Sequence, residues 1–242
     1  MKVWQELSKK LKETLNLELS PIAVGCFNDK LNIIDNDKKI RICRAILDAA
    51  KGKSIQISKE NNACFGAGWH LGFRKINNPN RENMIKKFVV EGEKLFSSYK
   101  ALDNLLSGME ELEDRSDSYF ILAPMEKADF IPQLVLFVCN PEEACRLLTL
   151  LTFTDGNMPK IKIGGPTCRM VISYPLSTGE ANISFYDYTS RKMCNVDRDK
   201  LIVSIPYDKF EEIVNSIENC SAGNAKIEFP QEFREFLKNK CL

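Results

Sequence analysis

Two glycine-rich segments of the sequence carry cysteines that could bind a metal or a metal–sulfur cluster. One is CFGAGWHLGF (64–73), which begins with Cys64, and the other is IGGPTCRM (163–170), which contains Cys168. Thiolates bind iron, and backbone N–H groups that glycine leaves accessible stabilise the sulfides of a cluster. The same segments are also compatible with tight turns around buried cysteines, since free cysteine is often a small core residue. Both interpretations stay open from these residues alone.

The chain has nine cysteines among its 242 residues but no C-x-x-C pair. In a reducing cytosol they do not form a disulfide framework, and a chain of this length can build a core without one. The missing C-x-x-C pair excludes the usual zinc-ribbon and bacterial ferredoxin spacings. Any metal site must therefore be assembled from distant parts of the chain.

The motifs of the two halves of the chain echo each other. Each half has an apolar strand that begins with proline and, further on, a Cys-Arg pair: PIAVGCF (21–27) with Cys43-Arg44, and PQLVLFVC (132–139) with Cys168-Arg169. A chance alignment would explain the echo equally well. If it is a duplication, we expect a pseudo-twofold axis that brings the two Cys-Arg pairs face to face.

The arginines and the single histidine offer further chemistry. Arg44 and Arg169 each follow a candidate ligand and could neutralise a cluster or hold an anionic substrate, or they could form surface ion pairs. His70 is either a buried structural residue or an acid/base near neutrality. One histidine cannot supply a histidine-rich zinc site, and no Walker loop, G-x-G-x-x-G or G-x-S-x-G motif is present.

The pattern of apolar residues predicts an α+β fold with mixed sheets and covering helices. Strands are expected at 22–27, 54–58, 119–124, 134–139, 168–175, 181–188 and 201–206, and helices at 41–53, 80–112 and 140–152. We expect the last two helices to cover the sheets. Since no linker or low-complexity segment interrupts the chain, residues 1–242 are expected to form a single globular domain, with half-repeats at 20–115 and 116–206.

Composition narrows the class of protein. Lys+Arg is 34 and Asp+Glu is 33, so the net charge of +1 argues against nucleic acid as the main partner. The sequence contains no run of about 18 apolar residues, so no membrane span is predicted. The amphipathic start MKVWQELSKKLKETLN lacks the apolar core of a signal peptide, so the expected location is cytoplasmic.

Taken together, these motifs resemble the archaeal and bacterial family named domain of unknown function 169. The resemblance covers about residues 20–206 and rests on PIAVGCF, RICRAILDAAKGK (41–53), CFGAGWHLG, NPEEA (140–144) and GGPTC (164–168). It implies three family-type cysteines, which are Cys43, Cys64 and Cys168. The last family motif is GEANISFYDYTSR (179–191) here, and it has Asp187 where the family pattern has cysteine. The resemblance implies a site but lends no reaction, because the family is uncharacterised.

The leading hypothesis is an oxygen-sensitive protein that holds a [4Fe–4S] cluster through Cys43, Cys64 and Cys168. The fourth iron is expected to take Asp187 or an exchangeable substrate or water.

The ligand expected at that iron is a small anionic or sulfur-containing molecule held by Arg44, Arg169 and Arg191. Three alternatives stay open: a redox or electron-transfer module with a partner protein, a zinc-stabilised Cys3Asp binding module, and a metal-free binder whose cysteines pack the core. The sequence does not decide whether the protein is an enzyme or what its oligomeric state is.

Overall fold

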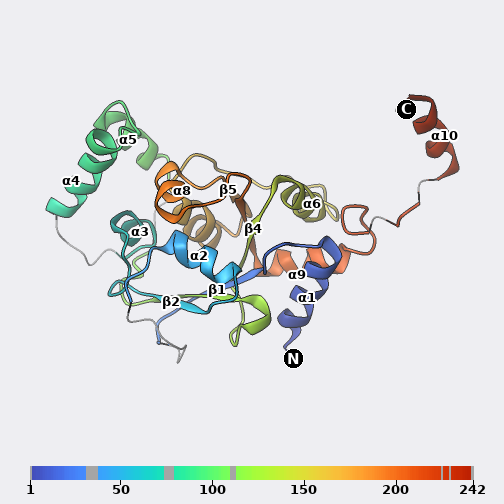
Figure 1. Ribbon diagram of the computed structural model, residues 1–242, viewed down its shortest axis with the longest axis horizontal. Coiled ribbons are helices and arrows are strands. Elements are labelled where there is room, and N and C mark those ends of the chain that lie inside the picture. Colours follow the sequence, from blue (N-terminus) through green and yellow to red (C-terminus); the bar gives the residue numbers. More distant parts are fainter. Residues whose placement is uncertain are drawn as a thin grey trace.

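The structure is a computed structural model that describes residues 2–30, 38–73, 79–109, 113–224, 226–228 and 230–240 (Figure 1). Six strands of these residues form one sheet in the order β2-β3-β1-β4-β6-β5. They are β1 (Ile22–Phe27), β2 (Ile55–Ile57), β3 (Tyr119–Pro124), β4 (Leu134–Cys139), β5 (Asn182–Ser184) and β6 (Leu201–Pro206). The predicted α+β class is confirmed. Every pair of neighbouring strands is antiparallel, so the prediction of mixed sheets is wrong.

The sheet is symmetric in strand order and register. If β1 is exchanged with β4, β2 with β5 and β3 with β6, the strand order becomes the original order read from the other edge of the sheet. At the centre Ala23 lies opposite Val135, and the pairs on either side are Ile22 with Leu136 and Val24 with Leu134. A pseudo-twofold axis through the central pair therefore relates the halves. This symmetry assigns β3 to the first half, so that half extends to Pro124 instead of ending near residue 115.

Side chains alternate between the two faces of the sheet because successive residues of a strand point to opposite sides. Ile22, Val24, Leu136 and Val138 join one apolar cluster, and Ala23, Val135 and Phe137 join the other. The second cluster is completed by α1 (Val3–Leu15), α6 (Pro141–Leu151) and α9 (Tyr207–Ser216). The predicted helix at 140–152 therefore covers the sheet as expected.

The opposite face of the sheet carries the elements that bear the predicted ligands. These are α2 (Ile42–Ala50), α3 (Phe65–His70), η3 (Arg169–Ser173), α7 (Tyr174–Thr178) and α8 (Tyr188–Cys194). The strand predicted at 168–175 is wrong, because this segment is helical. A short apolar run does not by itself distinguish a strand from a buried helix. Pro175 is accommodated because η3 is a π-helical turn, in which the N–H of Tyr174 bonds to the carbonyl of Arg169.

An arm projects from this face and is formed by α4 (Pro79–Lys87), η1 (Phe88–Gly92) and α5 (Tyr99–Ser107) (Figure 1). It lies beside α3 and α8 and does not cover the sheet, so that part of the prediction for 80–112 is wrong. Of the arm side chains that the structure describes, Leu102 alone is buried. The arm therefore has almost no core of its own.

The remaining elements lie outside the site. They are the short η2 (Met125–Lys127) and α10 (Gln231–Lys240), and α10 stands apart from the sheet in Figure 1. Among the described residues, no helix has the length and apolarity of a membrane span.

Candidate functional site

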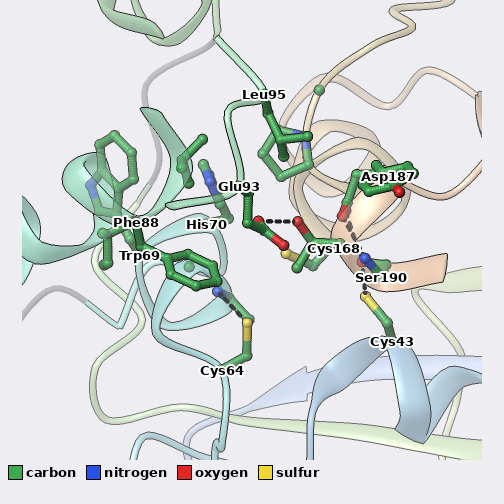
Figure 2. A pocket seen from close by; sticks show the side chains of 18 of the residues that line it. Cys43, Cys64, Trp69, His70, Phe88, Glu93, Leu95, Cys168, Asp187 and Ser190 are labelled. Carbon is green, nitrogen blue, oxygen red and sulfur yellow. Dashed lines mark hydrogen bonds between the residues drawn. The ribbon is translucent and has the colours of Figure 1, made fainter. Parts of the chain in front are cut away.

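A cavity of about 1330 Å³ lies between the arm and the helices α2, α3 and α8, on the face of the sheet opposite α1, α6 and α9. Cys43, Cys64, Cys168 and Asp187 all line it, so the structure brings together the four predicted ligand positions (Figure 2). They come from four separate segments: α2, the residue before α3, the residue before η3 and the residue before α8. Each half of the pseudo-symmetric fold contributes two of them.

The four positions form two equivalent pairs. Cys43 lies near the start of α2 and Cys168 immediately precedes η3, while Cys64 and Asp187 are the N-caps of α3 and α8. The sulfur of Cys64 accepts the N–H of Ala67 at 3.4 Å, and the carboxylate of Asp187 accepts the N–H of Ser190 at 2.8 Å. Both donors lie three residues after the cap. Asp187 therefore occupies the position in its half that Cys64 occupies in the other.

The carboxylate of Asp187 joins α8 to the loop that carries Cys168. Its Oδ2 accepts the backbone N–H of Thr167 at 2.8 Å and the hydroxyls of Thr167 and Ser190 at 2.7 and 2.8 Å. With the N–H of Ser190 on Oδ1, four hydrogen bonds reach this carboxylate. These bonds show a positioning role, whereas iron ligation by Asp187 stays a prediction.

Two cavity thiols, those of Cys43 and Cys168, are poor nucleophiles. Burial raises the pKa of Cys43 well above its ordinary value, and the charge of Asp187 adds to this effect. Burial also raises the pKa of Cys168 well above the usual range, followed by the charges of Cys43 and Cys64. Cys43 forms a hydrogen bond of 3.0 Å with the hydroxyl of Ser190. Because the thiolate is the reactive form, this arrangement does not favour covalent thiol catalysis.

The predicted ligands do not form a site for one metal ion. Within the residues that the structure describes, no group of three or more His, Cys, Asp or Glu side chains is arranged to hold a metal ion. Figure 2 shows the sulfurs of Cys43, Cys64 and Cys168 at separate places around the cavity. The Cys3Asp zinc alternative, which needs four ligands on one ion, therefore finds no support in this geometry.

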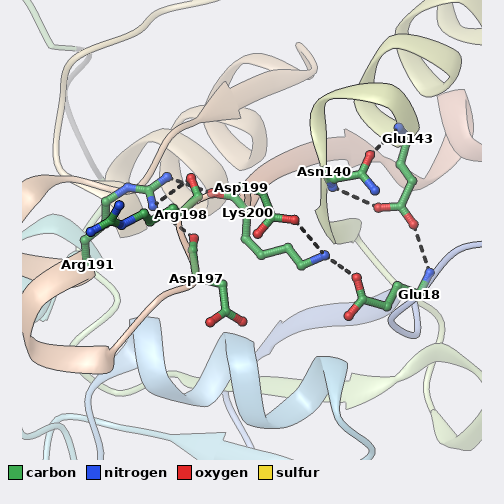
Figure 3. A network of polar contacts seen from close by, with 8 residues as sticks. All are labelled: Glu18, Asn140, Glu143, Arg191, Asp197, Arg198, Asp199 and Lys200. Carbon is green, nitrogen blue, oxygen red and sulfur yellow. Dashed lines mark hydrogen bonds and ion pairs between the residues drawn. The ribbon is translucent and has the colours of Figure 1, made fainter.

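Two of the three predicted anion-binding arginines are engaged elsewhere. Arg44 forms an ion pair of 3.0 Å with Asp48. Arg191 donates to the backbone carbonyl of Phe185 at 2.8 Å. It also donates to the carbonyl of Lys200 at 2.7 Å and to those of Asp197 and Arg198 (Figure 3). The expected role of Arg44 and Arg191 in holding a ligand is therefore not supported. Arg169 is buried beside His70, and its role stays a prediction.

Sequence reasoning missed several residues of the cavity. Cys194, which the motifs did not assign, also lines it, as does the hydroxyl-bearing Ser190. The D-x-x-S pattern of Asp187 and Ser190 is an N-cap signal and could have shown that the carboxylate is engaged by a helix. No comparable local signal marks Thr167.

His70 lines the cavity as a buried, uncharged side chain. Burial, helped by the positive charge of Arg169 and opposed by Asp187, lowers its pKa to about 3 from an ordinary value of 6.5. A group with a depressed folded-state pKa stabilises the fold above its unfolded pKa and loses that contribution as the pH falls.

We expect the free energy of unfolding to fall below about pH 6.5, by up to about 1.4 kcal/mol per pH unit, because the unfolded state takes up a proton that the folded state resists. Urea denaturation between pH 7 and pH 5 measures this, and His70→Gln should flatten the profile. The chain has no second histidine to obscure the result. An imidazole NMR signal that titrates near pH 6.5 in the folded protein would contradict the prediction.

The fold and the site define a class: an α+β protein of two pseudo-equivalent halves with a cysteine-lined cavity at their junction. The family model described as "Uncharacterised ArCR", domain of unknown function 169, matches residues 10–216, and the chain belongs to this family. It is similar to "Uncharacterized protein MJ0308" of Methanocaldococcus jannaschii, with 23% identity over 222 residues, which are 89% of this chain and 94% of that protein. No solved structure matches the chain significantly.

Proposed function

We propose that the protein binds a [4Fe–4S] cluster through Cys43, Cys64 and Cys168 and presents one iron to a small molecule in the cavity. The observation that carries this proposal is that three cysteines from three distant segments line one cavity. A cluster takes one thiolate at each of several iron atoms, so it suits sulfurs spread around a space better than a single ion does.

The electrostatics of the three cysteines support a bound cation or cluster. Burial and the negative charges of Cys43 and Cys64 raise the pKa of the Cys168 thiol. Without a nearby cation, the simultaneous ionisation of these three thiols is therefore strongly disfavoured. Cysteine ligates metals as the thiolate, and a positively charged iron centre would compensate that cost. The donor set therefore fits the cluster chemically.

The size of the cavity favours ligand binding over a pure electron-transfer role. Ligand pockets commonly have volumes of about 300–1,000 Å³, and this one is larger. When bound, the cluster would supply a Lewis-acidic iron at the inner end. Asp187 and Ser190 hold the Cys168 loop and Cys43 around that end, and the arm encloses it from outside.

Protein purified without oxygen is expected to be brown and to contain about four iron atoms and four acid-labile sulfides per chain. Addition of a small thiol should change its electron paramagnetic resonance spectrum after reduction, because the fourth iron has no cysteine. Colourless protein that carries zinc, or no metal after anaerobic reconstitution with iron and sulfide, would contradict the proposal. A cluster whose spectrum does not change when thiols or anions are added would instead indicate the electron-transfer alternative.

A further inference from the structure

We infer that the outer part of the cavity binds a molecule with an uncharged hydrocarbon body, such as an alkyl chain or a fused aromatic ring system. The inference goes beyond the proposed function and does not depend on iron. Contact between the same molecule and an iron atom would rest on the proposed function.

The walls of the outer cavity are apolar on both sides. The arm contributes Phe88, Val89, Leu95, Phe96 and Leu105. The body of the protein contributes Trp69, Ile163, Phe185 and Met193. A molecule between these walls would contact hydrocarbon and aromatic groups along most of its length, whereas the thiols lie at the inner end.

The apolar walls are left largely uncovered in the free chain. Phe88 is 49% exposed on the arm, and Phe185 is 52% exposed on the facing wall. Removing such surface from water is favourable in proportion to its area. An apolar body that fills the space therefore gains affinity from both walls at once, which a single flat patch would not provide.

The arm is held at its position by polar contacts with the second half of the chain. The hydroxyl of Thr189 donates to the carboxylate of Glu93 at 2.6 Å, and the ammonium of Lys162 donates to the carbonyl of Gly108 at 3.1 Å. Within the arm, Lys86 pairs with Asp103 at 2.8 Å. The first two contacts fix the middle and the C-terminal end of the arm beside the body of the protein, so the cavity is a built feature of the fold.

Hydrogen bonds and ion pairs engage several of the charged side chains along the lining. Lys86 is paired with Asp103, Glu93 accepts from Thr189, and Asp187 accepts four hydrogen bonds. Burying a charged group requires a partner charge or hydrogen bonds. An uncharged body matches walls on which these charges are already engaged.

The test uses the full chain and the neutral fluorescent probe N-phenyl-1-naphthylamine, which brightens in apolar surroundings. We expect saturable binding of about one probe per chain, with displacement by 1-dodecanol. Phe88→Ser should weaken binding by about tenfold. Leu105→Trp, which places a larger side chain in the cavity, should also weaken binding or change its stoichiometry. The matched control is Phe153→Ser, because Phe153 is 46% exposed but does not line the cavity, and it should bind like the unaltered chain.

Absence of saturable binding, or equal weakening by Phe88→Ser and Phe153→Ser, would overturn the inference. It would also be overturned by a dimer that Phe88→Ser dissociates, since a second copy would then cover this surface. A chain that binds the probe but no iron contradicts the cluster alone. A chain with a full cluster and no probe binding contradicts the hydrocarbon ligand alone.

Discussion

Replacing Cys168 by serine is expected to abolish the visible absorption and most of the iron of protein prepared without oxygen. The hydroxyl of serine is a harder and much less acidic ligand than a thiol, so one iron loses its attachment to the chain. Cys64→Ser should have the same effect, because its sulfur lines the same cavity. Iron and sulfide analysis, with visible spectroscopy, measures the loss.

The control for this loss is Cys220→Ser. Cys168 and Cys220 are 5% and 4% exposed, so both substitutions place a hydroxyl in a buried site, but Cys220 packs on the opposite face of the sheet. Cys220→Ser should lower stability without removing iron. Cys194→Ser should also keep the cluster, and loss of iron there would show that four thiolates bind and that no iron is open. Iron content unchanged by Cys64→Ser and Cys168→Ser would refute the cluster.

Replacing Asp187 by alanine is expected to reduce the free energy of unfolding by about 3 kcal/mol. The change removes the N-cap of α8 and leaves the N–H of Thr167, a fully buried residue, without its acceptor. Urea denaturation of the metal-free chain measures the effect. Asp155→Ala is the control, because Asp155 accepts two hydrogen bonds from Asn157 in an exposed turn and its loss should cost less than about 1 kcal/mol. Equal losses in the two variants would contradict the role assigned to Asp187.

The variant Asp187→Cys separates positioning from ligation. Cys64, at the equivalent cap, shows that a sulfur can accept the N–H three residues further on. The cysteine variant is therefore expected to fold, to keep the cluster and to provide a fourth thiolate. The spectrum should then no longer respond to added thiols or anions. A variant that still responds would show that the side chain at 187 does not reach the cluster.

The strands were predictable because their signal is local. The runs at 22–27, 119–124, 134–139 and 201–206 are almost entirely apolar, and each is a strand with cores on both faces. The run 168–175 is also largely apolar but is helical, since packing against the neighbouring elements decides such cases. Local composition could not show this.

The part of the site that was predictable from the sequence is the part marked by motifs that occur in both halves of the chain. Cys43, Cys64, Cys168 and Asp187 occupy positions that the echo between the halves marks, and the symmetric sheet shows why they share a cavity. The ligand-holding role expected of Arg44 and Arg191 is not supported because both have other partners: Asp48 in the same helix for Arg44, and carbonyls of the loop 197–200 for Arg191. The sequence predicted a helix at 80–112, but it does not show that apolar side chains of this segment line a cavity.

The division of the four positions between the two halves has a consequence for biosynthesis. A ribosome releases the chain from its N-terminus, so Cys43 and Cys64 emerge long before Cys168 and the cap of α8. The central β1–β4 contact cannot form until β4 has been translated. The two cysteines of the first half, Cys43 and Cys64, likewise have no partners from the second half until the loop with Cys168 has been translated. Under the proposed function, delivery of iron and sulfide therefore has to follow translation of the chain through Asp187. A truncated product that ends before residue 168 would carry two of the proposed ligands and could not complete the site.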